Sequence, residues 1–114
     1  MKVPKSDFKV FQEEFKKWQD RFDCNNWYTY FEFKPIEDAQ ASLRKNEESA
    51  ICCATLSSEL KHYPSDPKGN ALHESLHLLL AKLTWMAKCR FIHEEEIDAE
   101  DERVVRILEK WIKQ

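Results

Sequence analysis

The spacing of apolar residues changes twice along this 114-residue chain, and these changes limit the folds that it can adopt. Between Phe8 and Phe22 the aromatic side chains recur at steps of three and four, which places them on one face of an α-helix. Residues 27–34 alternate between two faces with a period of two, as in a β-strand. From Leu72 onward the helical spacing returns. The sequence therefore predicts an α+β protein that begins and ends with helices.

Turn-forming residues divide the chain into the expected elements. Asn25-Asn26 and Pro35 end the first helix and the first strand, and in Asp66-Pro67 an N-cap residue precedes a proline at the first helical position. We expect helices at about 6–21, at about 67–90 and at about 99–113, the first of them capped by Ser6 or Asp7. Strands are expected at 27–34, 39–45 and 50–56, with a turn at 46–49. Residues 91–98 would form a charged connector. The strands would form a small antiparallel or mixed sheet in one domain, residues 1–114.

Charge and composition exclude several classes of protein. The net charge is −3, and no basic patch is long enough for nucleic acid to be the main partner. Residues 76–87 are interrupted by Lys82 and are too short to cross a bilayer, and the amino terminus lacks the pattern of a signal peptide. A single glycine leaves no room for a phosphate-binding glycine-rich loop. We therefore expect a cytoplasmic protein without a nucleic-acid or membrane partner.

The four cysteines do not indicate a metal site of their own. Cys24, Cys52, Cys53 and Cys89 contain no C-x-x-C pair, so a zinc site built from cysteines alone is not expected. Nothing in the sequence marks the chain as secreted. We expect four reduced cysteines, mostly buried as small apolar side chains.

One motif carries recognisable chemistry. His73-Glu74-Ser75-Leu76-His77 is an H-E-x-x-H sequence within the expected second helix. Residues four apart lie on the same face of a helix, so both imidazoles can bind one metal ion, and Glu74 lies where it can act on a metal-bound water. The apolar stripe that we expect to face the core would place both histidines at its edge; it consists of Leu72, Leu76, Leu79, Leu80, Leu83 and Ala87.

A catalytic zinc ion needs three protein ligands and an open position, so one ligand must come from outside the motif. Projecting the apolar face of the last helix backwards at 100° per residue puts Glu100 and Asp101 on its inward side. We rank Asp101 first and Glu100 second as the third ligand. His93 and the acids at 94–96 come third, because a short connector can fold over a site.

Such a site would hydrolyse a peptide bond with a small set of residues. With zinc bound by His73, His77 and one of these acids, Glu74 would take a proton from the attacking water and pass it to the leaving amine. An exposed strand edge would hold an extended peptide or protein substrate by main-chain pairing. Tyr63 or His62, in the loop before the motif helix, is a candidate for stabilising an oxyanion.

Four segments carry a family resemblance: WYTYFEFKP at 27–35, EDAQA at 37–41, ALHESLHLLL at 71–80 and EDERVVRILE at 100–109. On these segments the chain resembles small zincin-like proteins of phages and prophages, sometimes grouped as minigluzincins, and the resemblance extends over most of its length. The resemblance implies a minimal zincin-like core and a host-cell cytoplasmic location. It also implies zinc bound by both motif histidines and by a glutamate shortly before a β-branched pair. Asp101 falls at that position, ahead of Val104-Val105, so an aspartate with a shorter reach replaces the glutamate, and the neighbouring Glu100 could substitute for it.

Three hypotheses remain open at this point. The first is a zinc-dependent metallopeptidase, a hydrolase with Glu74 as its base. The second is a zincin-fold binding or regulatory protein of phage or prophage origin, catalytically weak or inactive, and the short chain without a large subdomain after the motif suits it. The third is a helical core protein, in which the histidines meet carboxylates or carbonyls at the core edge and the acids at 94–102 form a solvated helix start. The substrate and the oligomeric state do not follow from the sequence.

Overall fold

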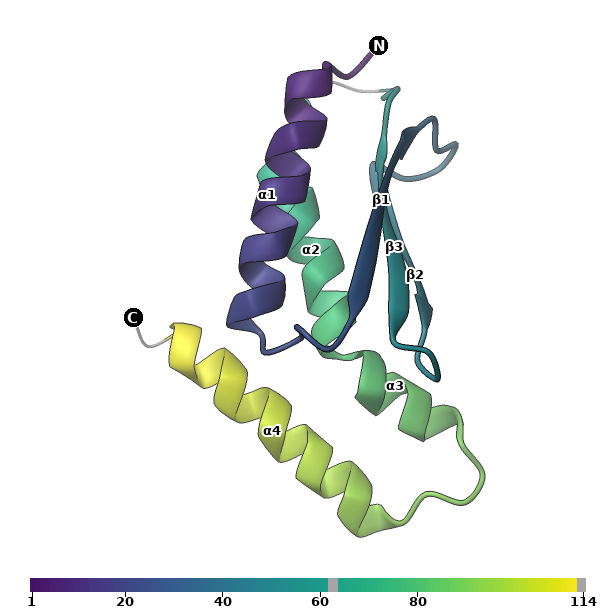
Figure 1. Cartoon of the computed structure of the whole chain (residues 1–114), viewed down its shortest axis with the longest axis vertical. Helices are drawn as coiled ribbons and strands as arrows, with labels where there is room; N and C mark the ends of the chain where they lie inside the picture. Colours follow the sequence, from purple (N-terminus) through teal and green to yellow (C-terminus); the bar gives the residue numbers. More distant parts are fainter. Residues whose placement is uncertain (62–63, 113–114) are drawn as a thin grey trace.

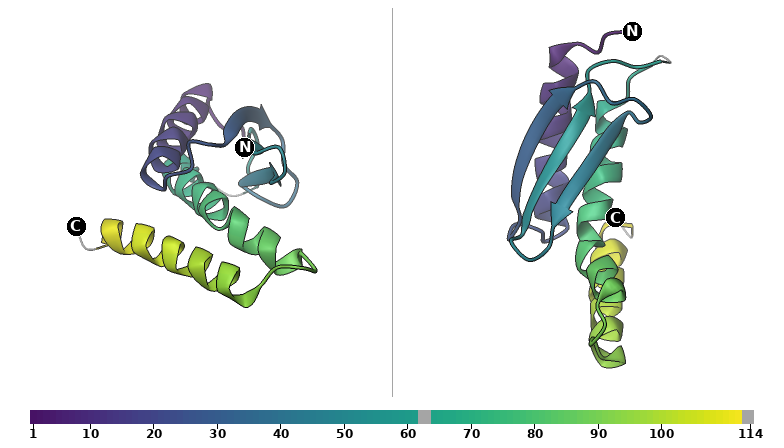
Figure 2. Two further views of the ribbon diagram at one scale, coloured as in Figure 1. Left: turned by 60° about the horizontal axis from the view of Figure 1, so that its bottom comes forward. Right: turned by 90° about the vertical axis from the view of Figure 1, so that its right-hand side faces the viewer.

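The order of elements follows the change in apolar spacing along the sequence. The computed structural model describes residues 1–61 and 64–112. Its helices are α1 (Lys5–Arg21), α2 (Pro67–Leu79), α3 (Ala81–Lys88) and α4 (Glu94–Ile112), and its strands are β1 (Tyr28–Lys34), β2 (Ala41–Asn46) and β3 (Ile51–Ser57). The strands form one sheet, and α1 and α2 cover one of its faces (Figure 1, Figure 2). The expected α+β class is confirmed.

The central strand of the sheet is β3, which pairs with both other strands. It runs parallel to β1, where Phe31 lies beside Ala54, and antiparallel to β2, where Leu43 lies beside Ala54. Residues 47–50 form the turn between β2 and β3, and Ala50 there has a positive φ of 54°. The sheet is therefore mixed, with β1 and β2 as its edges.

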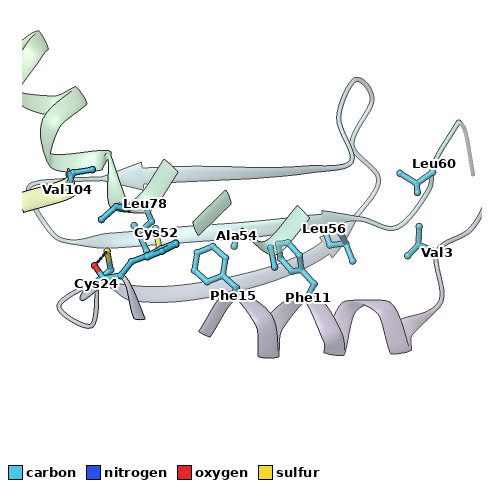
Figure 3. Packing of buried hydrophobic residues seen from close by; sticks show 13 residues of the cluster. Val3, Phe11, Phe15, Cys24, Cys52, Ala54, Leu56, Leu60, Leu78 and Val104 are labelled. Atoms are coloured by element: carbon cyan, nitrogen blue, oxygen red, sulfur yellow. Dashed lines mark hydrogen bonds between the residues drawn. The ribbon is translucent and has the colours of Figure 1, made fainter. Parts of the chain in front are cut away.

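Aromatic residues of α1 form the core against the inner face of the sheet. Phe11 and Phe15 are fully buried (Figure 3), and their rings meet the Phe31 ring edge-on at centroid distances of 6.4 and 5.6 Å. The ring of Phe8 stacks on that of Phe33 at 5.0 Å. Burying each phenylalanine contributes about 2–3 kcal/mol, so this layer supplies much of the apolar burial that holds α1 on the sheet.

Several boundaries differ from the sequence-based expectations. The N-cap of α1 is Pro4, whose backbone is extended, so the expectation of a cap at Ser6 or Asp7 is wrong. Asp7 instead lies in the first turn, where its negative charge interacts favourably with the partial positive charge at the helix N-terminus. Each strand begins one or two residues later than expected.

The expected helix at 67–90 is two helices, with a break at Leu80. Buried positions of α2 include Ala71, Ser75 and Leu78, and an unbroken helix would carry Lys82 onto the same face. The break turns α3 so that Ala81 is buried and Lys82 remains exposed. Within residues 1–61 and 64–112, none of the helices has the length and apolarity needed to span a bilayer.

The last helix is longer than expected and projects from the rest of the molecule. It begins at Glu94 with three glutamates in its first turn, so the expected connector at 91–98 is mostly helical. These acids favour a helix start because the N-terminal end of a helix carries partial positive charge. Val104 is buried, whereas Ile112, near the end of the helix, is 78% exposed. Because α3 and α4 extend beyond the sheet (Figure 1), the radius of gyration is 15.3 Å, against about 13 Å for a compact chain of this length.

Candidate functional site

The start of α2 fixes the register of the H-E-x-x-H motif. The Asp66 side chain accepts a hydrogen bond from the Gly69 backbone N–H at 3.0 Å, and Pro67 occupies the first helical position, as expected. A side chain at position 69 would collide with the Asp66 carboxylate, which explains why the only glycine of the chain is there. The cap therefore sets the rotation of the helix that carries the motif.

The two motif histidines form a pair on the surface of α2. The ring centroids of His73 and His77 lie 5.0 Å apart with an interplanar angle of 75°, and both side chains are exposed. The expectation that they lie at the edge of the core is wrong, because the buried stripe is centred on Ala71, Ser75 and Leu78, whereas Leu72 and Leu76 of the expected stripe are only partly buried. Two neighbouring imidazoles open to solvent can serve as two ligands of one metal ion.

Glu74 lies on the inner side of the motif, with its carboxyl oxygens still partly in contact with solvent. Its residue is only 6% exposed, and within residues 1–61 and 64–112 its carboxyl group has no hydrogen-bond partner. Burial raises the pKa of the Glu74 carboxyl, while the positive charge that His73 and His77 can carry opposes this shift. The sequence analysis named Glu74 but did not anticipate its burial, for which the small residues Ala71 and Ser75 around it were the available signal.

Glu100 is buried in a different part of the molecule and is fully paired. It is 4% exposed, and its two carboxylate oxygens accept hydrogen bonds from Nε and Nη2 of Arg103, the latter at 3.0 Å. Arg103 lines a cavity of about 240 Å³ together with Cys24 and Lys82. Cys24 and Val104 lie at the same end of the core (Figure 3). The geometry gives Glu100 a structural partner in place of a metal ion.

The other acids proposed as ligands remain in solvent. Asp101 is exposed, so its expected inward orientation is wrong: Val104 is the buried residue of the valine pair, and the residue one turn before it is Glu100. His93 and the acids at 94–96 are also exposed. In the described part of the chain, no group of three or more His, Cys, Asp or Glu side chains is arranged to hold a metal ion. The histidine pair fits zinc as two ligands, but within residues 1–61 and 64–112 no third ligand accompanies it. The oxyanion candidates His62 and Tyr63 lie outside the described residues.

A polar cluster that the sequence analysis missed lies on the outer face of the sheet. Glu32 accepts hydrogen bonds from the Cys53 thiol at 2.9 Å and from Arg44 at 2.5 Å, and its other oxygen lies 3.3 Å from Nζ of Lys34. The Cys53 contact, followed by that with Lys34, lowers the pKa of Glu32. The alternation of β1 and β2 was the available signal, since it places these charges on one face. All four groups satisfy one another, which accounts for the cluster structurally.

The cysteines are free thiols, two of them buried and two partly exposed. Cys24 and Cys52 are buried, and Cys53 and Cys89 are half-buried. Burial raises the pKa of Cys24 to about 11, against the opposing effect of Arg103. Burial also raises the pKa of Cys52.

Comparison with known proteins adds no family. No protein-family model, no curated protein and no solved structure matches this chain. The resemblance to zincin-like proteins therefore rests on the quoted sequence segments, and any function must be argued from the geometry of α2 and its surroundings.

Proposed function

We propose that this protein is a small zinc-dependent hydrolase of the H-E-x-x-H type, acting on peptide bonds. The observation that carries the proposal is the exposed pair of His73 and His77, with ring centroids 5.0 Å apart, next to the buried carboxyl group of Glu74. The first, second and fifth positions of such a motif place two imidazoles on one face of a helix with an acid beside them.

The residues of α2 would divide the chemistry between binding and proton transfer. His73 and His77 would hold the ion as neutral imidazoles, each through one ring nitrogen. Zinc, when bound, supplies a Lewis acid and lowers the pKa of water to roughly 7. Glu74 would accept a proton from the attacking water and donate it to the leaving amine. Glu100 and Asp101 remain the proposed third ligands, and either would have to approach the histidine pair to complete the site.

A peptide or protein substrate would be held by the edge strand nearest to α2. The side chain of Asn70, in the first turn of α2, donates a hydrogen bond to Oε1 of Gln40 at 3.1 Å, just before β2. The free edge of β2 is thus tied to the helix that carries the motif. An extended chain can add to such an edge through main-chain hydrogen bonds.

A second candidate function is a binding or regulatory protein that retains the fold and lacks catalysis. It is favoured by the bidentate pair of Glu100 with Arg103, which occupies the buried acid of α4. Breaking such a pair to recruit Glu100 would leave the partly exposed Arg103 guanidinium without its buried partner. This candidate needs no third ligand.

Zinc content and Glu74 dependence separate the two candidates. The full chain is loaded with zinc, freed of excess metal and measured for bound zinc and for cleavage of a peptide library. The peptidase predicts about one zinc per chain, loss of zinc in His73→Asn and His77→Asn, and a drop of about 10²–10⁴-fold in cleavage for Glu74→Gln with zinc retained. Glu48→Gln is the matched control for Glu74→Gln, because Glu48 is an exposed glutamate in a turn outside the motif.

The remaining outcomes are equally definite. Retention of zinc without cleavage of any library peptide would favour the binding protein. Absence of bound zinc, together with an unchanged melting temperature in its presence, would contradict a metal-dependent function. If zinc is bound, losses in Glu100→Gln or in Asp101→Asn identify the third ligand.

A further inference from the structure

The free edge of β1 presents a full set of unpaired backbone groups. The N–H of Tyr28 donates to Ala50 and the C=O of Lys34 accepts from Ser58, so the even-numbered residues of β1 face β3. Because alternate residues of a strand direct their backbone groups to opposite sides, those of Thr29, Phe31 and Phe33 point to the free edge. Within residues 1–61 and 64–112 these groups have no hydrogen-bond partner. Figure 2 shows β1 forming one side of the sheet.

Several of the devices that usually protect an edge strand are missing from β1. β1 is seven residues long without proline or a bulge, and it pairs with β3 along its whole length. Tyr28 and Tyr30 are 62% and 55% exposed on its outer face, with ring centroids 4.8 Å apart. A long, regular edge with exposed aromatic residues is a template for pairing with another chain.

The exposed face of α1 carries charges in a self-complementary order. Lys9, Glu13, Lys16 and Asp20 are all exposed and follow one another at steps of four, three and four. The Lys16 ammonium lies 5.6 Å from the centre of the Phe31 ring, so this charged stripe borders the edge of β1. Two copies of α1 side by side in opposite directions would place Lys9 beside Asp20 of the partner subunit and Glu13 beside Lys16 of the partner subunit.

The helix and the strand share the same centre of symmetry. The charged stripe is symmetric about the point between Glu14 and Phe15, and the Phe15 ring lies 5.6 Å from the Phe31 ring. The β1 strands of two copies can pair in antiparallel orientation, centred on Phe31. Phe31 then pairs with Phe31 of the partner subunit and Thr29 pairs with Phe33 of the partner subunit, so every backbone group at the free edge forms a hydrogen bond. A single twofold axis that passes between the two Phe31 residues would therefore relate both the strands and the helices of the two copies.

The outer face of the same arrangement is also complementary. Centring the pairing on Phe31 puts Tyr30 opposite Glu32 of the partner subunit and Tyr28 opposite Lys34 of the partner subunit. The exposed tyrosine rings would then lie against the aliphatic parts of charged side chains, as cross-strand pairs do in antiparallel sheets. No like charges face each other in this register.

We propose that the protein forms a twofold symmetric homodimer through β1 and α1, with one continuous sheet running across both copies. The interface is isologous, since each contact occurs twice about the axis. The main-chain ladder supplies affinity, and the stripe of α1 fixes the antiparallel direction and the register. The proposal does not depend on the chemistry of α2.

Charge reversal on α1 tests the interface without touching the core. Sedimentation equilibrium of the full chain over a range of concentrations should give a mass approaching twice 13.7 kDa. Glu13→Lys and Lys16→Glu each turn two attractive pairs into repulsive ones and should raise the dissociation constant by about tenfold. The double variant Glu13→Lys/Lys16→Glu restores complementarity and should return to within about twofold of the original value. Glu48→Lys, an equal charge change in an exposed turn, should have no effect.

A disulfide tests the register directly. In the proposed pairing, residues 28 and 34 are directly opposite across the axis, about 4.5 Å apart at Cα, which a disulfide can bridge. Within one copy they are about 20 Å apart along the strand, so they cannot pair with each other. Tyr28→Cys/Lys34→Cys should cross-link into dimers on mild oxidation, whereas either single variant should not. A monomer at every concentration up to about 1 mM, or a dimer that Glu13→Lys leaves unchanged and the double-cysteine variant does not cross-link, would overturn the proposal.

Discussion

The middle of α2 and the middle of α4 each bury a glutamate, and the two surroundings differ in one respect. Glu74 is 6% exposed and Glu100 is 4% exposed, so burial does not distinguish them. Arg103 holds both carboxylate oxygens of Glu100, whereas the carboxyl group of Glu74 has no hydrogen-bond partner among the described residues. The presence of a hydrogen-bond partner, and not the degree of burial, therefore distinguishes Glu100, which stabilises the fold, from Glu74, whose carboxyl group is available for proton transfer.

The physical consequence is opposite in the two regions. A buried carboxylate without a partner disfavours its charged form, so its pKa rises and it weakens the folded state at neutral pH. A buried ion pair is held by its geometry, and removing one partner leaves an uncompensated charge. A buried glutamate therefore lowers the stability of the folded state in α2, where it is Glu74, and contributes to that stability in α4, where it is Glu100.

The largest expected effect comes from breaking the pair in α4. Arg103→Met should lower the free energy of unfolding by about 3 kcal/mol, the lower end for a buried pair, because the Arg103 side chain is 38% exposed. Urea denaturation measures the change. Arg106→Met is the matched control, since Arg106 pairs at 3.1 Å with an exposed glutamate, and it should change stability by less than about 0.5 kcal/mol. Equal effects of both variants would mean that Glu100 is not held as described.

A change of opposite sign is expected in α2. Glu74→Met removes a buried carboxyl group without a partner and should raise the free energy of unfolding by about 1 kcal/mol at pH 8 in the presence of a chelator. Glu48→Met, at an exposed glutamate in a turn, should leave stability nearly unchanged. A loss of stability in Glu74→Met would show that this carboxyl group has a stabilising partner.

The same variant should also alter the pH dependence of stability. The pKa of Glu74 is raised in the folded protein above its ordinary value of 4.5, so the folded state holds this proton more tightly than the unfolded chain. Its contribution is fully present below pH 4.5 and is lost as the pH rises through the raised pKa. The stability advantage of Glu74→Met should therefore grow over this window and level off above it. A pH-independent difference between the two proteins would contradict the direction of the shift.

The smallest effect concerns the surroundings of Glu100, with Cys24 as the reporter. Because burial raises the pKa of Cys24 to about 11, this thiol should react with a thiol reagent at pH 8 about a hundredfold more slowly than the half-buried Cys89. Arg103→Met should slow the reaction of Cys24 further, because the positive charge of Arg103 lowers the pKa of this thiol. Mass spectrometry of digested protein assigns the labelled cysteine. Similar rates for Cys24 and Cys89 in the unmodified protein would contradict the closed environment of Glu100.

The fold could be predicted from the sequence where a local pattern had only one solution. In α1 the aromatic residues recur on one face and charges cover the other, so the buried face was evident. The alternation along 27–34 likewise identified β1 and its inner residues Phe31 and Phe33. In both cases the sequence spacing alone decides which side chains meet the core.

The region around the motif could not be resolved in this way, because leucines occur on more than one face of α2. The stripe through Leu72 and Leu76 and the stripe through Ala71 and Ser75 compete, and the close packing of α1 favours the one with small residues. That choice turns Glu74 inward and His73 outward. The error at Asp101 has a related origin, since a shift of one residue between Val104 and Val105 rotates every acid of α4 by 100°.

The order of strands in the sheet has a kinetic consequence. β2 and β3 are joined by a short turn and can pair early, at little loop-closure entropy, whereas β1 can join β3 only after residues 35–50 have been arranged. β1 is therefore expected to be the last strand to dock during folding. Until it docks, it exposes both edges and its aromatic face, so this segment would set how readily newly made chains aggregate before they reach the native state.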